Sequence, residues 1–107
     1  MGVSVSEIER LLGNHKDAYG YGWSFWYHEN IEPTAIAMDL DAEVIAKGGP
    51  TGYDYEVWLV IKVTDLDGTE RFFRKNGYYN SYEGHDWDGS FDEVSPKTQT
   101  VTVYEKV

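Results

Sequence analysis

The sequence predicts an α+β fold in which a short N-terminal helix is followed by a mainly antiparallel β-sheet of about five strands. A helix-start pattern stands near the N-terminus, and most later segments alternate apolar and polar residues. No helices separate those segments as a βαβ fold would require, so the strands are expected to pair antiparallel. At 107 residues the chain has the length of a single domain, 1–107. The pattern leaves open whether the strands form an open sheet or a small barrel.

The helix is predicted to start at residues 6–9, SEIE, which have the form of a capping box. In that motif the Ser6 hydroxyl and the Glu9 carboxylate accept hydrogen bonds from open backbone N–H groups. One helical face then carries three apolar residues, Ile8, Leu11 and Leu12. Gly13-Asn14 provides a stop, so the helix has about two turns and packs over one end of a larger element.

The next two segments are predicted strands. Residues 20–29, GYGWSFWYHE, are dense in aromatic residues, and one face of the predicted strand carries Trp23, Phe25 and Tyr27. After Pro33, residues 36–44 alternate with period two, which favours a strand with one wet face. A helix over residues 34–47 is the alternative, because the segment is rich in alanine and its apolar residues also fit a spacing of four.

The clearest strand is residues 53–64, YDYEVWLVIKVT, which follows a flexible turn at 48–52, GGPTG. Its centre, 57–61, is apolar on both faces, which is typical of a strand in the middle of a sheet and covered on both sides. We therefore expect Trp58 to lie in the core.

The rest of the chain is predicted to contain a hairpin and a final strand. Residues 65–68, DLDG, form its turn, with Gly68 free to adopt positive φ, and 69–75 return as a strand. Asn76-Gly77 predicts another turn, and 99–105, QTVTVYE, alternate as a last strand. One basic cluster is expected to neutralise neighbouring acids across the hairpin: Arg71, Arg74 and Lys75.

The segment with the strongest functional signal is 78–93, YYNSYEGHDWDGSFDE. It holds five aromatic residues and five carboxylates, with no lysine or arginine. Aromatic residues at surfaces tend to be contact residues, and unopposed carboxylates create a negative field. Trp87 is expected either to close the core as a lid or to lie at the contact surface. The predicted contact surface consists of Tyr79, Tyr82, Glu83, His85, Asp86, Trp87, Asp88 and Asp92.

Catalytic and metal-binding patterns are weak. Carboxylates near His85 suggest a hard-cation site, but the glycine in DWDG comes too early for an EF-hand loop, and no glutamate stands at the twelfth position. The DLDG turn fails the same test. The chain has no cysteine and no GxSxG or P-loop pattern, and its many carboxylate pairs are expected by chance. We therefore expect a protein that is not an enzyme and has no metal site or cofactor.

The net charge of the chain indicates which kinds of partner it can bind. Nineteen acids against nine bases give a net charge of -10. This charge argues against direct binding to nucleic acid or to an anionic membrane, and it favours a basic protein. The acidity can also serve only solubility. The N-terminus lacks a secretory pattern and no window is long and apolar enough to span a membrane, so a cytoplasmic protein is expected.

The C-terminal part resembles a group of small bacteriophage proteins. The shared pattern reads GGxxG, then WxVxxV, then GYYxSYxGxxWDGxFxEVxP, and ends in TVTVYE. Here its residues are Gly48, Gly49, Gly52, Trp58, Val60, Val63, Gly77, Tyr78, Tyr79, Ser81, Tyr82, Gly84, Trp87, Asp88, Gly89, Phe91, Glu93, Val94, Pro96 and 100–105. The resemblance covers about sixty residues, and residues 26–30, WYHEN, are similar to a preceding WHEN stretch with one tyrosine inserted. It carries over no catalytic residue.

What the resemblance implies is a setting in the cytoplasm of an infected host cell. Small acidic phage proteins often act by binding host machinery, including nucleases and defence complexes. The first hypothesis is therefore a non-enzymatic protein that binds a basic host protein through its acidic aromatic surface, in the manner of an inhibitor of a nucleic-acid-binding or defence factor. The alternatives are a structural or accessory virion component and a module that binds a small ligand such as a sugar. The sequence leaves the oligomeric state undetermined.

Overall fold

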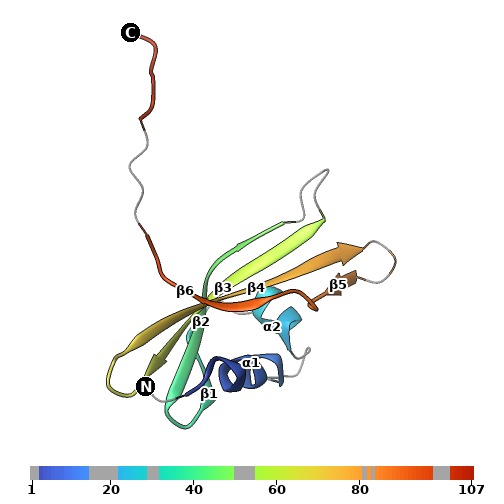
Figure 1. The fold of residues 1–107 in the computed structure, drawn as a ribbon, viewed down its shortest axis with the longest axis vertical. Helices are drawn as coiled ribbons and strands as arrows, with labels where there is room; N and C mark the ends of the chain where they lie inside the picture. The colour runs from blue at the N-terminus through green and yellow to red at the C-terminus, as the bar shows by residue number, and fades with distance from the viewer. Residues whose placement is uncertain are drawn as a thin grey trace.

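The computed structural model describes residues 3–14, 22–28, 32–49, 55–80, 82, 84–97 and 102–107, and for Ser24 and His85 it describes the backbone alone. Its elements are α1 (Val5–Asn14), α2 (Trp23–His28), β1 (Thr34–Ala37), β2 (Leu40–Gly48), β3 (Glu56–Asp65), β4 (Glu70–Asn80), β5 (Gly84–Asp86) and β6 (Phe91–Val94). Figure 1 shows both helices beside a twisted antiparallel sheet. The predicted α+β fold with a short N-terminal helix is confirmed, and the sheet is open.

In the described part of the chain six strands fill five rows of this sheet, in the order β1-β2-β3-β4-β5, and β6 also pairs with β4. β4 has room for both because it is the longest strand. Its first half pairs with β6 and its last three residues pair with β5. β3 therefore occupies the middle row, as the sequence predicts.

The capping residue of helix α1 lies two residues before the predicted one. The Ser4 Oγ accepts a hydrogen bond from the Glu7 N–H at 3.2 Å, so Ser4 is the capping residue and Ser6 lies inside the helix. SVSE at 4–7 has the same serine-to-glutamate spacing as SEIE, which explains the error. The predicted apolar face is confirmed, with Ile8 and Leu12 fully buried. Gly13-Asn14 forms the last residues of the helix.

The predicted strand over 20–29 is wrong for its described part, because Trp23–His28 form helix α2. Trp23, Trp26 and Tyr27 have the i, i+3, i+4 spacing of one helical face, and all three pack into or against the core. The Trp26 Nε1–H donates to the Leu12 carbonyl at 2.9 Å, so α2 also satisfies an open backbone group at the end of α1. This tertiary packing outweighs the β propensity of the aromatic residues.

The segment 36–44 is extended and not helical, as predicted, but it contains two strands instead of one. A turn at Met38-Asp39 separates β1 from β2, and Ala37 pairs with Leu40 across it. Met38 is fully exposed at this turn, whereas Leu40 and Ala42 are buried. Period-two alternation continues through a tight turn without interruption, so the sequence pattern could not reveal the chain reversal.

The hairpin between β3 and β4 is confirmed, and the turn predicted at Asn76-Gly77 is wrong. Gly68 has φ 88° and its N–H donates to the Asp65 carbonyl at 3.1 Å. At Asn76-Gly77, in contrast, β4 continues without a turn. A Cβ on Gly77 would lie 2.7 Å from the Trp87 ring, so the glycine is needed for a close approach within the sheet.

Two other predicted segments lie partly outside the described residues. Gly48 ends β2 and Gly49 has φ 76°, in agreement with a turn there, while 50–52 are not described. Of the predicted last strand, the described residues 102–105 form no strand. They belong to an exposed C-terminal segment that Figure 1 places away from the sheet.

One face of the sheet holds the whole described core. α1 contributes Ile8 and Leu12, α2 contributes Trp26 and Tyr27, and the sheet contributes Leu40, Ala42, Val57, Leu59, Ile61, Val63 and Phe73. Because residues of both helices belong to this single cluster, both helices cover the same face. Phe73 also stacks on Phe91 of β6, with ring centroids 5.3 Å apart.

A buried lysine joins the helices to this face. Lys75 is only 5% exposed, and its ammonium donates to the Gly89 carbonyl at 2.8 Å. It also lies 3.5 Å from the Glu9 carboxylate of α1 and 5.2 Å from the Trp23 ring centroid of α2. A charge at such a position is tolerated only when it has partners, so Lys75 requires α1, α2 and the loop before β6 to be in place.

The Lys75→Met substitution is expected to lower the free energy of unfolding by about 2 kcal/mol, because the side-chain length is kept while the charged hydrogen bond is lost. Lys62→Met is the matched control. Lys62 forms ion pairs with Glu43 and Glu70 at a more exposed position, where the loss should stay below about 1 kcal/mol. Urea unfolding followed by circular dichroism measures both. Equal losses would show that Lys75 has no special role.

The β3–β4 turn contains the carboxylate with the most strongly lowered pKa. A hydrogen bond with the Asp65 carboxyl, together with those from the Thr69 hydroxyl and N–H, lowers the pKa of Asp67 from 3.8 to about 2. A group whose pKa is lowered by folding stabilises the folded state above its unfolded pKa. This contribution is lost as the pH falls through the folded value.

Asp67→Asn should therefore reduce the fall in melting temperature between about pH 4 and pH 2, the window set by these two pKa values. Thermal unfolding at steps of pH measures the effect. Asp39→Asn, in the exposed turn between β1 and β2, removes the same charge and separates the local effect from the change in net charge. Parallel curves for wild type and Asp67→Asn would contradict the prediction.

Candidate functional site

The second face of the sheet, here called the outer face, is opposite the helices. Strand alternation and register place on it Trp58, Val60 and Lys62 of β3, Phe72, Arg74, Asn76 and Tyr78 of β4, and Asp92 and Val94 of β6. In the described part of the chain neither helix covers it, and its apolar residues Trp58, Val60, Phe72 and Val94 are all only half-buried. An apolar sheet face without a covering layer is typical of a docking surface.

The prediction that Trp58 lies in the core is wrong, because its side chain belongs to this outer face. The indole lies across Gly48 of β2, where a Cβ would come within 2.6 Å of its Nε1. Arg74 stacks over the indole, with its guanidinium carbon 4.7 Å from the ring centroid. Trp58 is therefore held in place on both sides while it remains half-exposed.

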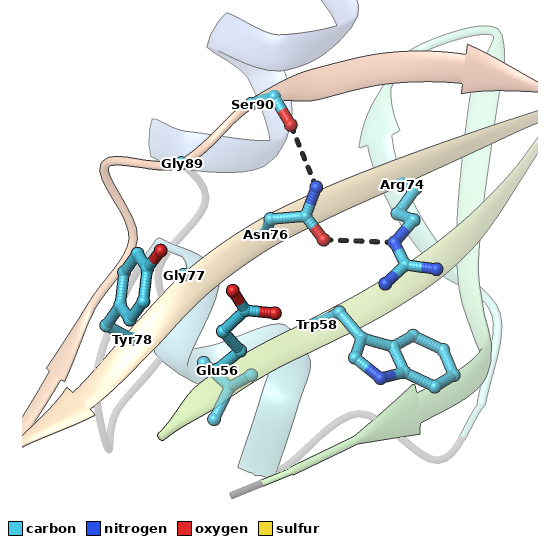
Figure 2. Close-up of a pocket in the computed structure, with 9 residues that line it drawn as sticks. Glu56, Trp58, Arg74, Asn76, Gly77, Tyr78, Gly89 and Ser90 are labelled. Atoms are coloured by element: carbon cyan, nitrogen blue, oxygen red, sulfur yellow. Dashed lines mark hydrogen bonds between the residues drawn. The ribbon is translucent and has the colours of Figure 1, made fainter. Parts of the chain in front are cut away.

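Beside Trp58 lies a first groove of about 390 Å³, to which β3, β4 and the loop before β6 contribute. Figure 2 shows its polar chain, in which the Arg74 Nε–H donates to the Asn76 Oδ1 at 2.9 Å and the Asn76 amide donates to the Ser90 Oγ at 2.8 Å. Gly89 completes the wall, since a Cβ there would lie 2.4 Å from the Asn76 carbonyl oxygen. These hydrogen bonds fix the orientation of Arg74 before any partner binds.

A second groove, of about 460 Å³, lies at the end of the sheet where β4 turns into β5. Its lining residues are Tyr55, Tyr78, Tyr79, Asn80, Tyr82, Gly84 and Asp86, and we call it the tyrosine groove. Tyr78 lines both grooves, so the two meet at this residue. The register pairs Tyr78 with Glu56 on one side and with Asp86 on the other, which places one ring between two carboxylates.

The rim of the outer face is acidic. The register places five carboxylates and two bases on this face. The carboxylates are those of Asp41, Glu43, Glu56, Glu70 and Asp92, and the bases are Lys62 and Arg74. Lys62 is paired with Glu43 and Glu70, and Arg74 is engaged by Trp58 and Asn76. The face therefore combines an apolar and aromatic centre with an excess of carboxylates.

The basic cluster is only partly as predicted. Arg71 forms a two-pronged hydrogen bond with Glu93 of β6, at 3.0 and 2.8 Å, which lowers the pKa of Glu93 and raises that of Arg71. It also donates to the Val3 carbonyl at 2.6 Å and so connects the residues before α1 to β4. Neither this pair nor that of Lys75 crosses the β3–β4 hairpin. The ion pair that does so is Lys62 with Glu70, at 3.3 Å.

The residues of the predicted contact surface are separated by the fold. Tyr79, Tyr82 and Asp86 line the tyrosine groove, while Asp88 and Asp92 are exposed farther along the same edge. Trp87 is half-buried against the core, and its ring centroid lies 5.3 Å from that of Tyr27. This position agrees with the predicted role of a lid on the core. Glu83 and the side chain of His85 are outside the described residues. The contact role of the whole set stays a prediction.

Three residues of the outer face were missed by sequence reasoning: Trp58, Phe72 and Arg74. The strand pattern shows that apolar residues occur on both faces of β3, but it does not show which face the helices cover. Gly48 is the one local signal, because a glycine paired with a tryptophan across two strands allows the ring to lie over it. That pairing becomes visible only when the register is known.

Within the described ranges, no three His, Cys, Asp or Glu side chains gather as they would around a metal ion. In the same ranges, no helix has the length and apolar character needed to cross a membrane. No family model, curated protein or solved structure matches the chain. The fold and the grooves define a small antiparallel-sheet protein with one helix-covered face and one open face.

Gly77→Ala should destabilise the protein by about 1–3 kcal/mol, because a Cβ at this position would lie 2.5 Å from the Asp86 carbonyl oxygen and would push β5 away from β4. Gly48→Ala is the control. Its Cβ meets the half-exposed Trp58 side chain and not a backbone atom, and this side chain can shift toward solvent at the cost of its contacts with Gly48 and Arg74, so a smaller loss is expected. Chemical unfolding measures both, and a neutral effect of Gly77→Ala would contradict the described contact.

Proposed function

We propose that this chain is a non-enzymatic bacteriophage protein that binds a basic host protein through its outer face. The observation that carries the proposal is the open sheet face, on which half-exposed Trp58, Val60 and Phe72 are surrounded by carboxylates. Binding surfaces commonly combine an apolar centre with a polar rim. Here the tyrosine groove extends that centre toward Tyr82 and Asp86.

Electrostatics supports a basic partner. The net charge of -10 attracts a positive surface over a long range and repels nucleic acid. The carboxylates of the rim can then occupy positions on the partner that otherwise contact phosphates. The protein would in this way inhibit a nucleic-acid-binding or defence factor without binding nucleic acid itself.

The resemblance of the C-terminal part to small phage proteins supports the setting, which is the cytoplasm of an infected cell. The walls of the two grooves consist of tyrosines, a stacked tryptophan and hydrogen-bonded amides. Binding of a partner accounts for such walls without a catalysed reaction. This composition supports recognition and not turnover, and no cofactor or metal is part of the proposal.

A structural or accessory virion component is the second candidate. The exposed C-terminal segment favours it, because Val103 and Tyr104 are apolar or aromatic and lie outside the sheet. Such side chains are suited to contacts between copies. Gel filtration with light scattering separates the candidates, since a monomer supports the host-binding proposal and a stable ring or filament supports the virion one.

The host-binding proposal predicts that immobilised protein retains a specific partner from host lysate at low salt and loses it as salt rises. The double variant Glu56→Gln/Asp92→Asn should weaken binding of the captured partner about tenfold, because it neutralises two carboxylates of the outer face. Titration of the purified partner by isothermal calorimetry gives the Kd.

The control is Glu32→Gln/Asp39→Asn, which removes the same charge near the opposite edge of the sheet. It should change the Kd by less than about twofold, since rim charges matter chiefly near the contact. The proposal is wrong if no protein is retained at low salt, if retention does not depend on salt, or if the two double variants weaken binding equally.

A further inference from the structure

We infer that the tyrosine groove receives a proline-rich segment that carries a lysine or arginine. The inference rests on the proposed function in taking the partner to be basic, and it goes further by naming the partner's local chemistry. It also concerns a different part of the surface from the Trp58 groove.

The groove presents more aromatic surface than a stable fold needs. Tyr55 is 60% exposed, Tyr78 is 56% exposed and Tyr82 is 96% exposed, and all three line the same hollow. The register places Tyr78 beside Glu56 on the outer face, opposite the helices. Exposed tyrosines gathered in one groove contribute little to folding, so a bound partner is the natural cause of their gathering.

The backbone around these rings is held in place. The Tyr79 N–H donates to the Tyr55 carbonyl at 2.8 Å, which joins the chain before β3 to the end of β4. The Tyr82 N–H donates to the Asn80 Oδ1 at 2.7 Å within the turn after β4. These two hydrogen bonds orient the backbone of Tyr55, Tyr79 and Tyr82 before binding, which lowers the entropy cost of association.

A proline-rich chain matches this chemistry. In the polyproline II conformation its rings pack against aromatic faces, and its carbonyl groups remain open acceptors for tyrosine hydroxyls. Proline has no N–H, so the ligand needs few acceptors from the groove. Its extended conformation already exists before binding, and little further entropy is lost.

The charge of the groove selects a cation beside the prolines. Tyr78 lies between Glu56 and Asp86 in the register, and no lysine or arginine is among the described lining residues. A lysine or arginine of the ligand would meet Asp86 at the wall and gain from the ring face of Tyr78. A neutral sugar also suits tyrosine and asparagine, but it gains nothing from the net charge of -10.

The probe is a fluorescein-labelled synthetic peptide with repeated proline and an arginine at each end, titrated with purified protein and followed by anisotropy at low salt. Tyr82→Ala should weaken binding about tenfold, and Tyr82→Phe should retain most of the affinity because the ring remains. Tyr104→Ala is the matched control, since Tyr104 is equally exposed but lies on the C-terminal segment.

A second pair of variants tests whether binding requires the negative charge of the groove. Asp86→Asn should weaken binding and reduce its salt dependence, whereas Asp39→Asn, in the β1–β2 turn, should leave both unchanged. Peptides with glutamate in place of arginine, or alanine in place of proline, should not bind. Tyr82, Asp86 and their controls are all exposed, so the variants are expected to fold, which circular dichroism verifies.

Absence of saturable peptide binding overturns the inference, as does equal weakening by Tyr82→Ala and Tyr104→Ala. Saturable binding of neutral oligosaccharides without binding of the peptide assigns the groove to sugars and also overturns it. These outcomes are independent of the lysate experiment. Binding of a host partner can be weakened by Glu56→Gln/Asp92→Asn and be unchanged by Tyr82→Ala. That result would support the proposed function and contradict only the inference of a proline-rich ligand.

Discussion

The positions of both helices are coupled to one buried cation, Lys75, on the side of the sheet that holds the core. Its ammonium contacts the Glu9 carboxylate, the Trp23 ring and the Gly89 carbonyl, so one charge joins α1, α2 and the loop before β6 to β4. A buried ammonium without these partners would cost several kcal/mol. Lys75 therefore favours the observed arrangement, in which both helices lie on the core face, and in the described part of the chain neither helix covers the other face.

Because both described helices lie on one face of the sheet, the outer face is open, and the proposed function depends on this face. The ring of Trp58 rests on Gly48 and under Arg74 instead of in the core, and Tyr78 connects this site with the tyrosine groove. Glu56 lines the first groove and Asp86 lines the tyrosine groove, while the bases of this face, Lys62 and Arg74, are already engaged. The face thus presents aromatic surface inside a negative field, which is the combination that a basic protein partner requires.

The candidate site could be predicted only in part. Tyr82 and Asp86 could be predicted from the acidic aromatic segment 78–93. The composition of that segment indicates surface residues without any knowledge of how the strands pair. Trp58 and Tyr55 could not be found in this way. Trp58 belongs to β3 and Tyr55 directly precedes that strand, both at least twenty residues before Tyr78, and only the pairing of β3 with β4 brings them beside it.

The sequence by itself determined the elements whose physics is local. These are the N-terminal helix, the central strand β3 and the turn at Gly68, where spacing or positive φ decides the conformation. Tertiary packing decided the rest. It made 23–28 a helix against the core, carried β4 straight through Asn76-Gly77 because Trp87 approaches the bare glycine, and chose the face of β3 that the helices cover. Alternation along a strand distinguishes two faces, but which face becomes the core depends on contacts between segments distant in sequence.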